Sequence, residues 1–253
     1  MLEPINLYLV LGTLKSGRRE IVYDLIEGSC DFQSANHIVL INNDEPDTGS
    51  LEKFQNLLNT HTLQWHFLNN DLQIPDLPIS STASCNKVFL ILSSKNNLID
   101  QIEGFKNWLS KHPIFSLSRI LGVIDCQLAY NNPESLSWFS ALIHFSDYIF
   151  LTYGELVSHK WVNDFIQSFE KEHYPTIFEK IKKNQVSNPD AALNPQSRRM
   201  SLLFDKLDAI DTLEINENAL PDEPFDLKIK EDPFLERNSE GKRIIKLTPP
   251  VQN

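Results

Sequence analysis

The loop that follows the first apolar run contains the residues best suited to do chemistry. Gly12 and Gly17 enclose four residues, among them Lys15 and Ser16, in the stretch LVLGTLKSGRREIVYDLI. This is the spacing of the phosphate-binding loop G-x-x-x-x-G-K-[ST], in which backbone N–H groups close around phosphate oxygens at the start of a helix. The spacing therefore indicates a frame that could hold a nucleotide phosphate.

The two chemically active positions of this motif hold other residues. Arg18 stands where the motif has the lysine that reaches the outer phosphates, and Arg19 stands where it has the hydroxyl that binds magnesium. Arg18 could still pair with a phosphate, although its planar fork fits the loop less well than lysine does. Arg19 cannot ligate a cation, and phosphoryl transfer depends on positioning and charge neutralisation. We expect little or no hydrolysis; from the loop alone, a glycine turn that binds nothing is an equally good interpretation.

A sheet of buried strands has to present this loop. Near-continuous apolar runs, typical of parallel strands covered on both faces, occupy residues 5–11, 37–41, 87–92, 119–125 and 147–151. Amphipathic helical patterns lie between or after them, at 18–27, 97–109, 134–145 and 155–170. This alternation predicts an α/β fold, a doubly wound, mostly parallel sheet flanked by helices, as in P-loop NTPases.

The C-terminal part of the sequence differs from the rest in residue composition and pattern. We expect the domain to cover residues 1–184, followed at 185–209 by a turn-rich linker and an amphipathic helix. Met200, Leu203, Phe204 and Leu207 would form the apolar face of that helix. Residues 210–253 are acidic and contain prolines, which predicts an irregular extension. Within that tail, FDLKI and RIIKL are best suited to become ordered, as added strands or by docking.

Composition excludes several classes of protein. The net charge of −11 and the pI of about 5.1 argue against nucleic acid or an anionic membrane as partner. Three scattered cysteines predict reduced thiols and no metal centre, and His61 and His66 are interpreted as surface or strand residues. No apolar run approaches the roughly 20 residues that span a bilayer. The first residues lack the basic region of a signal peptide, so we expect a cytoplasmic protein.

The order of segments resembles the CobW family of P-loop GTPases, relatives of HypB and UreG that act as metal-insertion chaperones. GTLKSGRREIVYDLI, residues 12–26, matches the family's GFLGSGKTTLLNHLL without a gap. The strand HIVLIN runs into Asn43, Asp44 and Glu45, where the family has V-N-E-F-G-E. GVID, which ends at Asp125, is similar to the family's V-V-D.

The last matching segment, SDYIFLTYGELV, is similar to the family's A-D-x-I-x-L-N-K-x-D-L-V. The resemblance covers roughly residues 5–175 and implies GTP or GDP with magnesium. The guanine-reading N-K-x-D, however, is replaced by a segment that begins with Thr152 and Tyr153 and ends with Glu155. Glu155 could accept hydrogen bonds from a guanine; the interpretation we prefer is an acid at a helix N-terminus, which the helix dipole favours.

Two further family motifs are absent from the sequence. The C-x-C-C metal motif has no counterpart beside the single Cys85, and E-T-[ST]-G is replaced by LSSKN at 92–96. Four motifs have thus lost their chemical residues while strand pattern and spacing persist. An α/β domain without this ancestry is the remaining interpretation of the pattern.

Three functions follow as hypotheses. The first is a pseudo-GTPase scaffold with no catalytic residue, no metal site and no required cofactor, which binds an unknown protein partner or itself. The second is a residual binder of GTP or GDP, a CobW-type metal chaperone with weak or no hydrolysis, in which Asp44 or Asp125 holds a cation. The third is an interaction protein that uses the helix at 200–207 and the tail, although that helix is better interpreted as packed on its own domain. The degenerate nucleotide site would comprise Gly12, Lys15, Ser16, Gly17, Arg18, Arg19, Asn43, Asp44, Asp125, Thr152 and Glu155.

Overall fold

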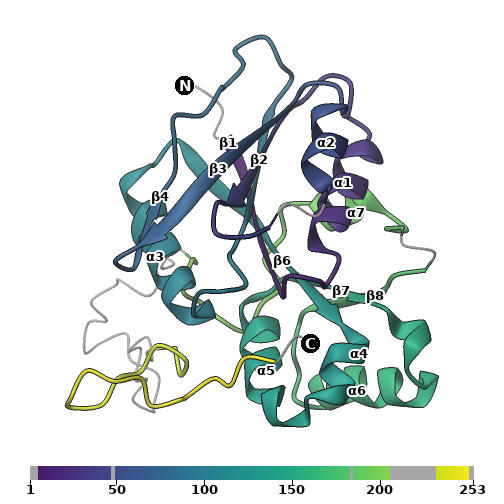
Figure 1. Cartoon of the computed structure of the whole chain (residues 1–253), viewed down its shortest axis with the longest axis vertical. Helices are drawn as coiled ribbons and strands as arrows, with labels where there is room; N and C mark the ends of the chain where they lie inside the picture. Colours follow the sequence, from purple (N-terminus) through teal and green to yellow (C-terminus); the bar gives the residue numbers. More distant parts are fainter. Residues whose placement is uncertain (1–4, 47–48, 183–184, 206–231, 251–253) are drawn as a thin grey trace, which may run out of the picture.

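A computed structural model describes residues 5–46, 49–182, 185–205 and 232–250. Its centre is an eight-stranded sheet in the order β4-β3-β2-β5-β1-β6-β7-β8, in which all neighbours are parallel except β3 and β4 (Figure 1). The strands are β1 Ile5–Gly12, β2 Asn36–Asn42, β3 Thr60–Leu68, β4 Asp71–Gln73, β5 Asn86–Ile91, β6 Phe115–Asp125, β7 Tyr148–Thr152 and β8 Ile177–Lys180. The predicted fold class, a mostly parallel α/β sheet, is confirmed.

Helices cover both faces of the sheet, and each face has its own apolar core. Residues of β1 alternate between the two cores, with Leu7 and Leu9 in one and Tyr8 and Val10 in the other, because successive strand residues point to opposite faces. Helices α3, α4, α5 and α6 supply the first core, and α1, α2 and α7 supply the second. The helices are α1 Arg18–Glu27, α2 Ser50–Gln55, α3 Leu98–Lys111, α4 Cys126–Asn131, α5 Leu136–Phe145, α6 His159–Lys171 and α7 Pro189–Leu193, with single 3₁₀ turns at Pro133–Ser135 and Gly154–Leu156.

The helix expected at 200–207 is wrong over its described residues, 200–205, which form an irregular segment. Polar anchors hold the chain there in place of helical hydrogen bonds. The Arg198 N–H donates to Asp147 Oδ1 at 2.6 Å, and the Ser201 N–H donates to the carbonyl of His144 at 3.2 Å. Leu203 and Phe204 still pack against the core, so the apolar residues are used without a helix.

The C-terminal segment 232–250 lies against α3 and α5. His144 Nε2 lies 2.9 Å from Asp232 Oδ2, and Leu235 is buried in the core. Arg243 donates to Asp100 at 2.7 Å and to Glu103 at 2.6 Å. The RIIKL segment, residues 243–247, is therefore ordered by docking without becoming a strand, whereas FDLKI lies outside the described residues.

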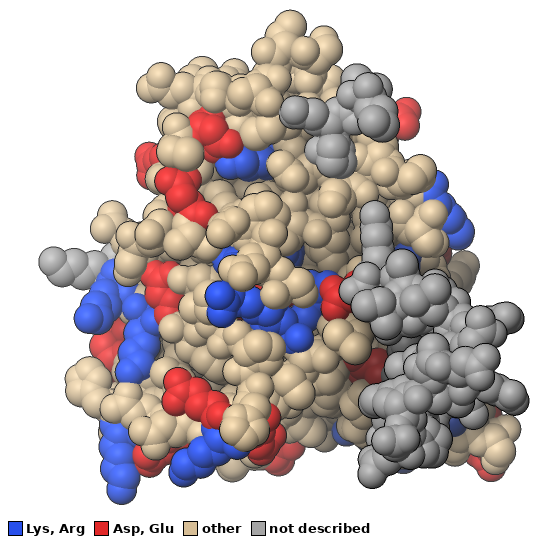
Figure 2. Space-filling model, turned by 180° about the vertical axis from the view of Figure 1, so that it is seen from behind, with Lys and Arg blue, Asp and Glu red and all other residues tan. Residues whose placement is uncertain are grey.

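Charge is distributed without one continuous basic surface on the face drawn in Figure 2. Among the described residues there, Lys and Arg side chains alternate with Asp and Glu. No helix of the described part of the chain is long and apolar enough to cross a membrane. The three cysteines are free thiols, and of these Cys126 is buried.

His37 is a buried polar residue whose titration can be tested. Its side chain is fully buried, and neither ring nitrogen has a hydrogen-bond partner among the described residues. Burial, assisted by the charge of Lys87, lowers its pKa to about 4. Because the unfolded chain takes up this proton near pH 6.5 and the folded chain does not, the free energy of unfolding falls between about pH 6.5 and 4, by at most about 1.4 kcal/mol per pH unit.

His37→Leu is therefore expected to flatten the dependence of stability on pH between about pH 6.5 and 4. Urea denaturation at several pH values measures this slope. His61→Leu, a change at an exposed position in β3, serves as the control and should leave the slope unchanged. An unchanged slope in His37→Leu would mean that His37 is protonated in the folded chain.

Candidate functional site

The carboxyl ends of the parallel strands place the candidate residues along one edge of the sheet. β1 lies between β5 and β6, so chain connections diverge to either side of it. Such a switch point opens a crevice outside the strand ends, where open α/β sheets bind ligands. The loop Gly12–Gly17, the segment after β5 and Asp125 at the end of β6 all lie at this edge.

The loop keeps the shape expected from its glycines. Gly17 adopts φ 84° and caps α1, a left-handed conformation that favours glycine. The Ser16 N–H donates to the Thr13 carbonyl at 3.2 Å, and the Ser16 hydroxyl donates to the same oxygen at 2.9 Å. One N–H and one hydroxyl that could face a ligand are thus used inside the loop, while Lys15 is exposed.

Arg18 fills the interior behind this loop. Its side chain is 1% exposed and donates to the carbonyl oxygens of Gly12, at 3.1 Å, and of Leu92. Its other terminal nitrogen forms an ion pair with Glu45. Burial lowers the pKa of Arg18, and the charge of Glu45 opposes that effect. The guanidinium therefore points into the protein, toward β2 and β5, and is held by three acceptors.

Arg19 joins the same cluster from the next position. It donates to Glu45 Oε2 at 3.3 Å and to the Ser50 hydroxyl at 3.2 Å. The Ser94 N–H also donates to Glu45, at 2.6 Å. Burial alone would raise the pKa of Glu45, but Arg18 and the Ser94 N–H bring it below its usual value. We call Arg18, Arg19 and Glu45 the Arg–Glu cluster.

The last residue of β7 and the residue after it contact the loop as well. Thr152 donates from its hydroxyl to the Ser16 carbonyl at 2.8 Å and to the Ile124 carbonyl at 3.2 Å. Tyr153 adopts φ 53°, and its hydroxyl would lie 3.9 Å from a Cβ placed at Gly17. Thr152 therefore ties β7 to the loop.

The remaining candidate residues are only partly brought together. Asp125 accepts a hydrogen bond from the Leu128 N–H at 2.9 Å and so caps α4. Asn43 and Asp44 are exposed after β2. Glu155 lies in the first turn of a 3₁₀ helix and lines a cavity beside α6 and β8. Within the described residues, no three His, Cys, Asp or Glu side chains meet as a metal site would require.

Sequence reasoning did not assign Glu45 a role. It was matched to the family's V-N-E-F-G-E stretch, but the ion pair with Arg18 depends on a partner 27 positions away. The signal in the sequence was the pair of adjacent arginines at an expected helix start, where the dipole disfavours cations and a nearby carboxylate compensates them.

Gly12 is expected to be intolerant of a side chain. Its φ is 153°, and a Cβ would lie 2.8 Å from both Ser16 Oγ and the Val123 carbonyl. Gly12→Ala should lower the free energy of unfolding by about 1–3 kcal/mol through this overlap and the unfavourable φ. At Gly17 the nearest atom to a Cβ is Thr152 Cγ2 at 3.6 Å.

Gly17→Ala therefore carries only the cost of the left-handed conformation, about 1 kcal/mol. Urea denaturation of both variants separates crowding from backbone strain. If Gly12→Ala and Gly17→Ala lowered the free energy of unfolding equally, the atoms around Gly12 would have moved to make room for the new methyl group.

Fold and loop together define a doubly wound α/β protein with a phosphate-loop frame between β1 and α1. Neither a protein-family model nor a curated protein sequence matches this chain. Among solved structures, the Zn(II)-bound YjiA GTPase from E. coli is similar with 10% identity and a TM-score of 0.49, over 88% of this chain and 67% of that one.

FtsY from Mycoplasma mycoides is similar with 12% identity and a TM-score of 0.47, over 74% of this chain and 64% of that one. The signal recognition particle receptor FtsY from Elizabethkingia anophelis, in complex with GDP, has 14% identity and a TM-score of 0.38, over 60% of this chain and 49% of that one. These values leave the chemistry of the site to be inferred from its own residues.

Proposed function

We propose that this chain is a CobW-like pseudo-GTPase, a domain that has the phosphate-loop frame, does not hydrolyse nucleotides and acts by binding a protein partner. The observation that carries the proposal is the position of Arg18. The Arg18 guanidinium is 1% exposed and is hydrogen-bonded to Gly12, Leu92 and Glu45. It therefore cannot contact a phosphoryl group and neutralise its charge during transfer. Catalysis of phosphoryl transfer needs that charge at the phosphate.

Magnesium does not fit the residues that are present. The position of the metal-binding hydroxyl holds Arg19, which is a cation, and the Asp125 carboxylate caps α4. Magnesium sites use oxygen ligands in octahedral geometry. The cluster supplies two guanidinium groups and one carboxylate already engaged by both of them. We therefore derive no step through a metal ion.

One observation favours a second candidate function, which is nucleotide binding without hydrolysis. The Arg–Glu cluster has two positive charges and one negative charge at the N-terminal end of α1, where the helix dipole also attracts anions. The Nε of Arg18 is buried without a hydrogen-bond partner among the described residues. A nucleotide phosphate would balance this excess, provided that the loop opened.

Calorimetric titration of the full chain with GTP, GDP and ATP, with and without magnesium, tests both candidates. The proposal expects no heat with any nucleotide and no phosphate release above buffer. Heat without hydrolysis would favour the second candidate.

Hydrolysis that is lost in Gly17→Val would overturn the proposal. Gly241→Val is the matched control, because Gly241 also has a left-handed φ, of 77°, a Cβ there meets no atom within 4 Å, and it lies in the C-terminal segment and not in the loop.

A further inference from the structure

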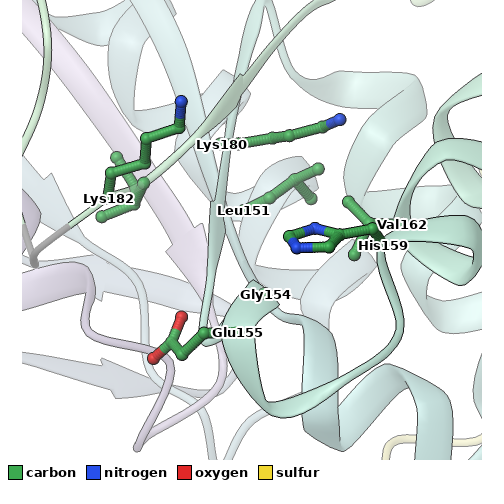
Figure 3. A pocket seen from close by; sticks show the side chains of 8 residues that line it. Leu151, Gly154, Glu155, His159, Val162, Lys180 and Lys182 are labelled. Atoms are coloured by element: carbon green, nitrogen blue, oxygen red, sulfur yellow. The ribbon is translucent and has the colours of Figure 1, made fainter.

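A groove runs along the β8 edge of the sheet, beneath α6. A cavity of about 560 Å³ lies between the end of β7, the start of α6 and the residues that follow β8 (Figure 3). A second cavity, of about 410 Å³, lies farther along between α6 and β8. Lys180 lines both cavities, so they are neighbours along one strand. We call the space between Val162, Asn163 and Ile166 of α6 and Phe178, Lys180 and Ile181 the α6–β8 groove.

Among the described residues, one side of the strand in this groove has no neighbouring strand. β8 is the last strand of the sheet and pairs in parallel with β7. The N–H groups of Ile177 and Ile181 donate toward β7, to Asp147 and Leu151. Because alternate residues of a parallel strand direct their backbone groups to opposite sides, Phe178 and Lys180 direct their N–H and C=O groups outward. An outward row of this kind is a template for another strand.

The side chains of the groove define what would fit. Val162 and Leu151 give it an apolar floor near one end, with Ile166 and Phe178 farther along. Figure 3 shows His159, Lys180 and Lys182 around the larger cavity, with Glu155 as its acidic member. Lys180 donates to Asn163 Oδ1 at 2.6 Å, so its charge is held across the groove. In a chain with net charge −11, this end carries two lysines against one carboxylate.

We propose that the α6–β8 groove binds an extended, acidic segment of a partner protein, which adds a strand to β8. This inference rests on the proposed partner-binding function and names the surface that serves it. Backbone hydrogen bonds to Phe178 and Lys180 supply the pairing. Alternate apolar side chains of the segment enter the groove under Ile166, and its carboxylates lie beside Lys180 and Lys182.

A second copy of the chain fits the groove less well. An antiparallel pair that uses both Phe178 and Lys180 of each copy places the two Glu179 side chains directly opposite each other. Like charges at opposed positions of a sheet are destabilising. The Glu179 carboxylate is moreover engaged, by the Tyr148 hydroxyl at 2.7 Å and by the Ser187 N–H at 2.6 Å.

Selection of random linear peptides displayed on phage against the immobilised full chain tests the proposal. Selected peptides are expected to alternate apolar residues with Asp or Glu. Their affinity should fall by about tenfold or more in the double variant Lys180→Glu, Lys182→Glu, because attraction becomes repulsion. The double variant Lys106→Glu, Lys111→Glu on α3 has the same change in net charge at exposed positions away from the groove and should bind as the unchanged chain does.

Backbone pairing is tested separately with the tightest selected peptide. Methylation of alternate amide nitrogens on one side of its strand should abolish binding, and methylation on the other side should not. No recovered peptide, equal binding to Lys180→Glu, Lys182→Glu, or indifference to methylation would each overturn the proposal. A dimer in sedimentation that is lost in that lysine variant would instead assign the edge to a second copy.

These outcomes are separable from those for the proposed function. If the groove binds no peptide while the chain neither binds nor hydrolyses nucleotides, only the assignment of the groove fails. If GTP is hydrolysed in a Gly17-dependent manner, the pseudo-GTPase proposal fails whatever the peptides do.

Discussion

Replacement of Glu45 by alanine is expected to lower the free energy of unfolding by about 3–5 kcal/mol, because removing one partner of a buried ion pair leaves the others uncompensated. The Glu45 side chain is 1% exposed and lies between the guanidinium groups of Arg18 and Arg19. It also accepts the Ser94 N–H, which would lose its acceptor. Urea denaturation at pH 7 measures the loss.

Asp44→Ala is the matched control, since the neighbouring carboxylate is exposed and should contribute less than about 0.5 kcal/mol. Similar losses in the two variants would contradict a structural role for the Arg–Glu cluster. A smaller loss in Glu45→Ala accompanied by new nucleotide binding would show that freed Arg18 can face the loop, which favours the second candidate function.

The Glu45 carboxylate should also contribute to the loss of folding stability at acidic pH. The pKa of Glu45 is held below its usual value in the folded chain, so its contribution to stability is complete above about pH 4.5 and is lost as the pH falls through the folded pKa. Glu45→Gln should remove this part of the acid dependence. The effect of His37 lies at higher pH, between about 6.5 and 4, so the two residues are distinguishable.

Asp147→Ala is expected to cause a second large loss, again about 3–5 kcal/mol. Asp147 is fully buried and accepts the N–H groups of Ile120, at 2.7 Å, and of Arg198, at 2.6 Å. It also accepts the Arg199 guanidinium at 3.1 Å. The variant would leave two backbone donors and the Nη1 group of Arg199 without an acceptor. Urea denaturation measures the loss, and hydrogen exchange at Ile120 and Arg198 locates it.

Asp205→Ala separates the arginine contact from the backbone contacts. Asp205 pairs with the other terminal nitrogen of Arg199 at 2.6 Å but is 34% exposed, so its loss should cost less than about 1 kcal/mol. Increased exchange in Asp147→Ala should be concentrated at β6 and the segment after Pro195. Uniform exchange throughout the sheet would instead indicate global destabilisation without a local tether.

The two large losses of stability expected for Glu45→Ala and Asp147→Ala both involve ion pairs with residues that stand at or near positions of the motifs described above. Asp147 stands in the segment that resembles the family's A-D-x-I stretch, and Arg18 stands at the lysine of the loop. In this structure the first ties β6 to the 198–199 segment, and the second closes the loop against Glu45. Asp147 and Arg18 thus serve packing and internal ion pairing.

Strands that are buried on both faces could be predicted from the sequence, whereas the outer strands could not. Every residue of β2 is buried, which gives the continuous apolar run that marks such a strand. β3 has only Trp65 fully buried in the sequence THTLQWHFL, and β8 has four half-buried or exposed residues. Strands near an edge are covered less, so their apolar pattern is weak. The segment at 200–205 had helical spacing, but the contact of Arg198 with Asp147 just before it and that of Ser201 with His144 outweighed local propensity.

The glycine frame of the loop follows from residue types alone, because the left-handed φ of Gly17 and the close approach at Gly12 are local requirements that only certain residues meet. The residue types also show that the lysine and the hydroxyl of the motif are absent. The direction of the Arg18 side chain, in contrast, depends on how the strands pack together. The partner of Arg18, Glu45, follows a different strand, and charge pairing at low exposure depends on which strands are adjacent, a property that residue spacing along the chain does not contain.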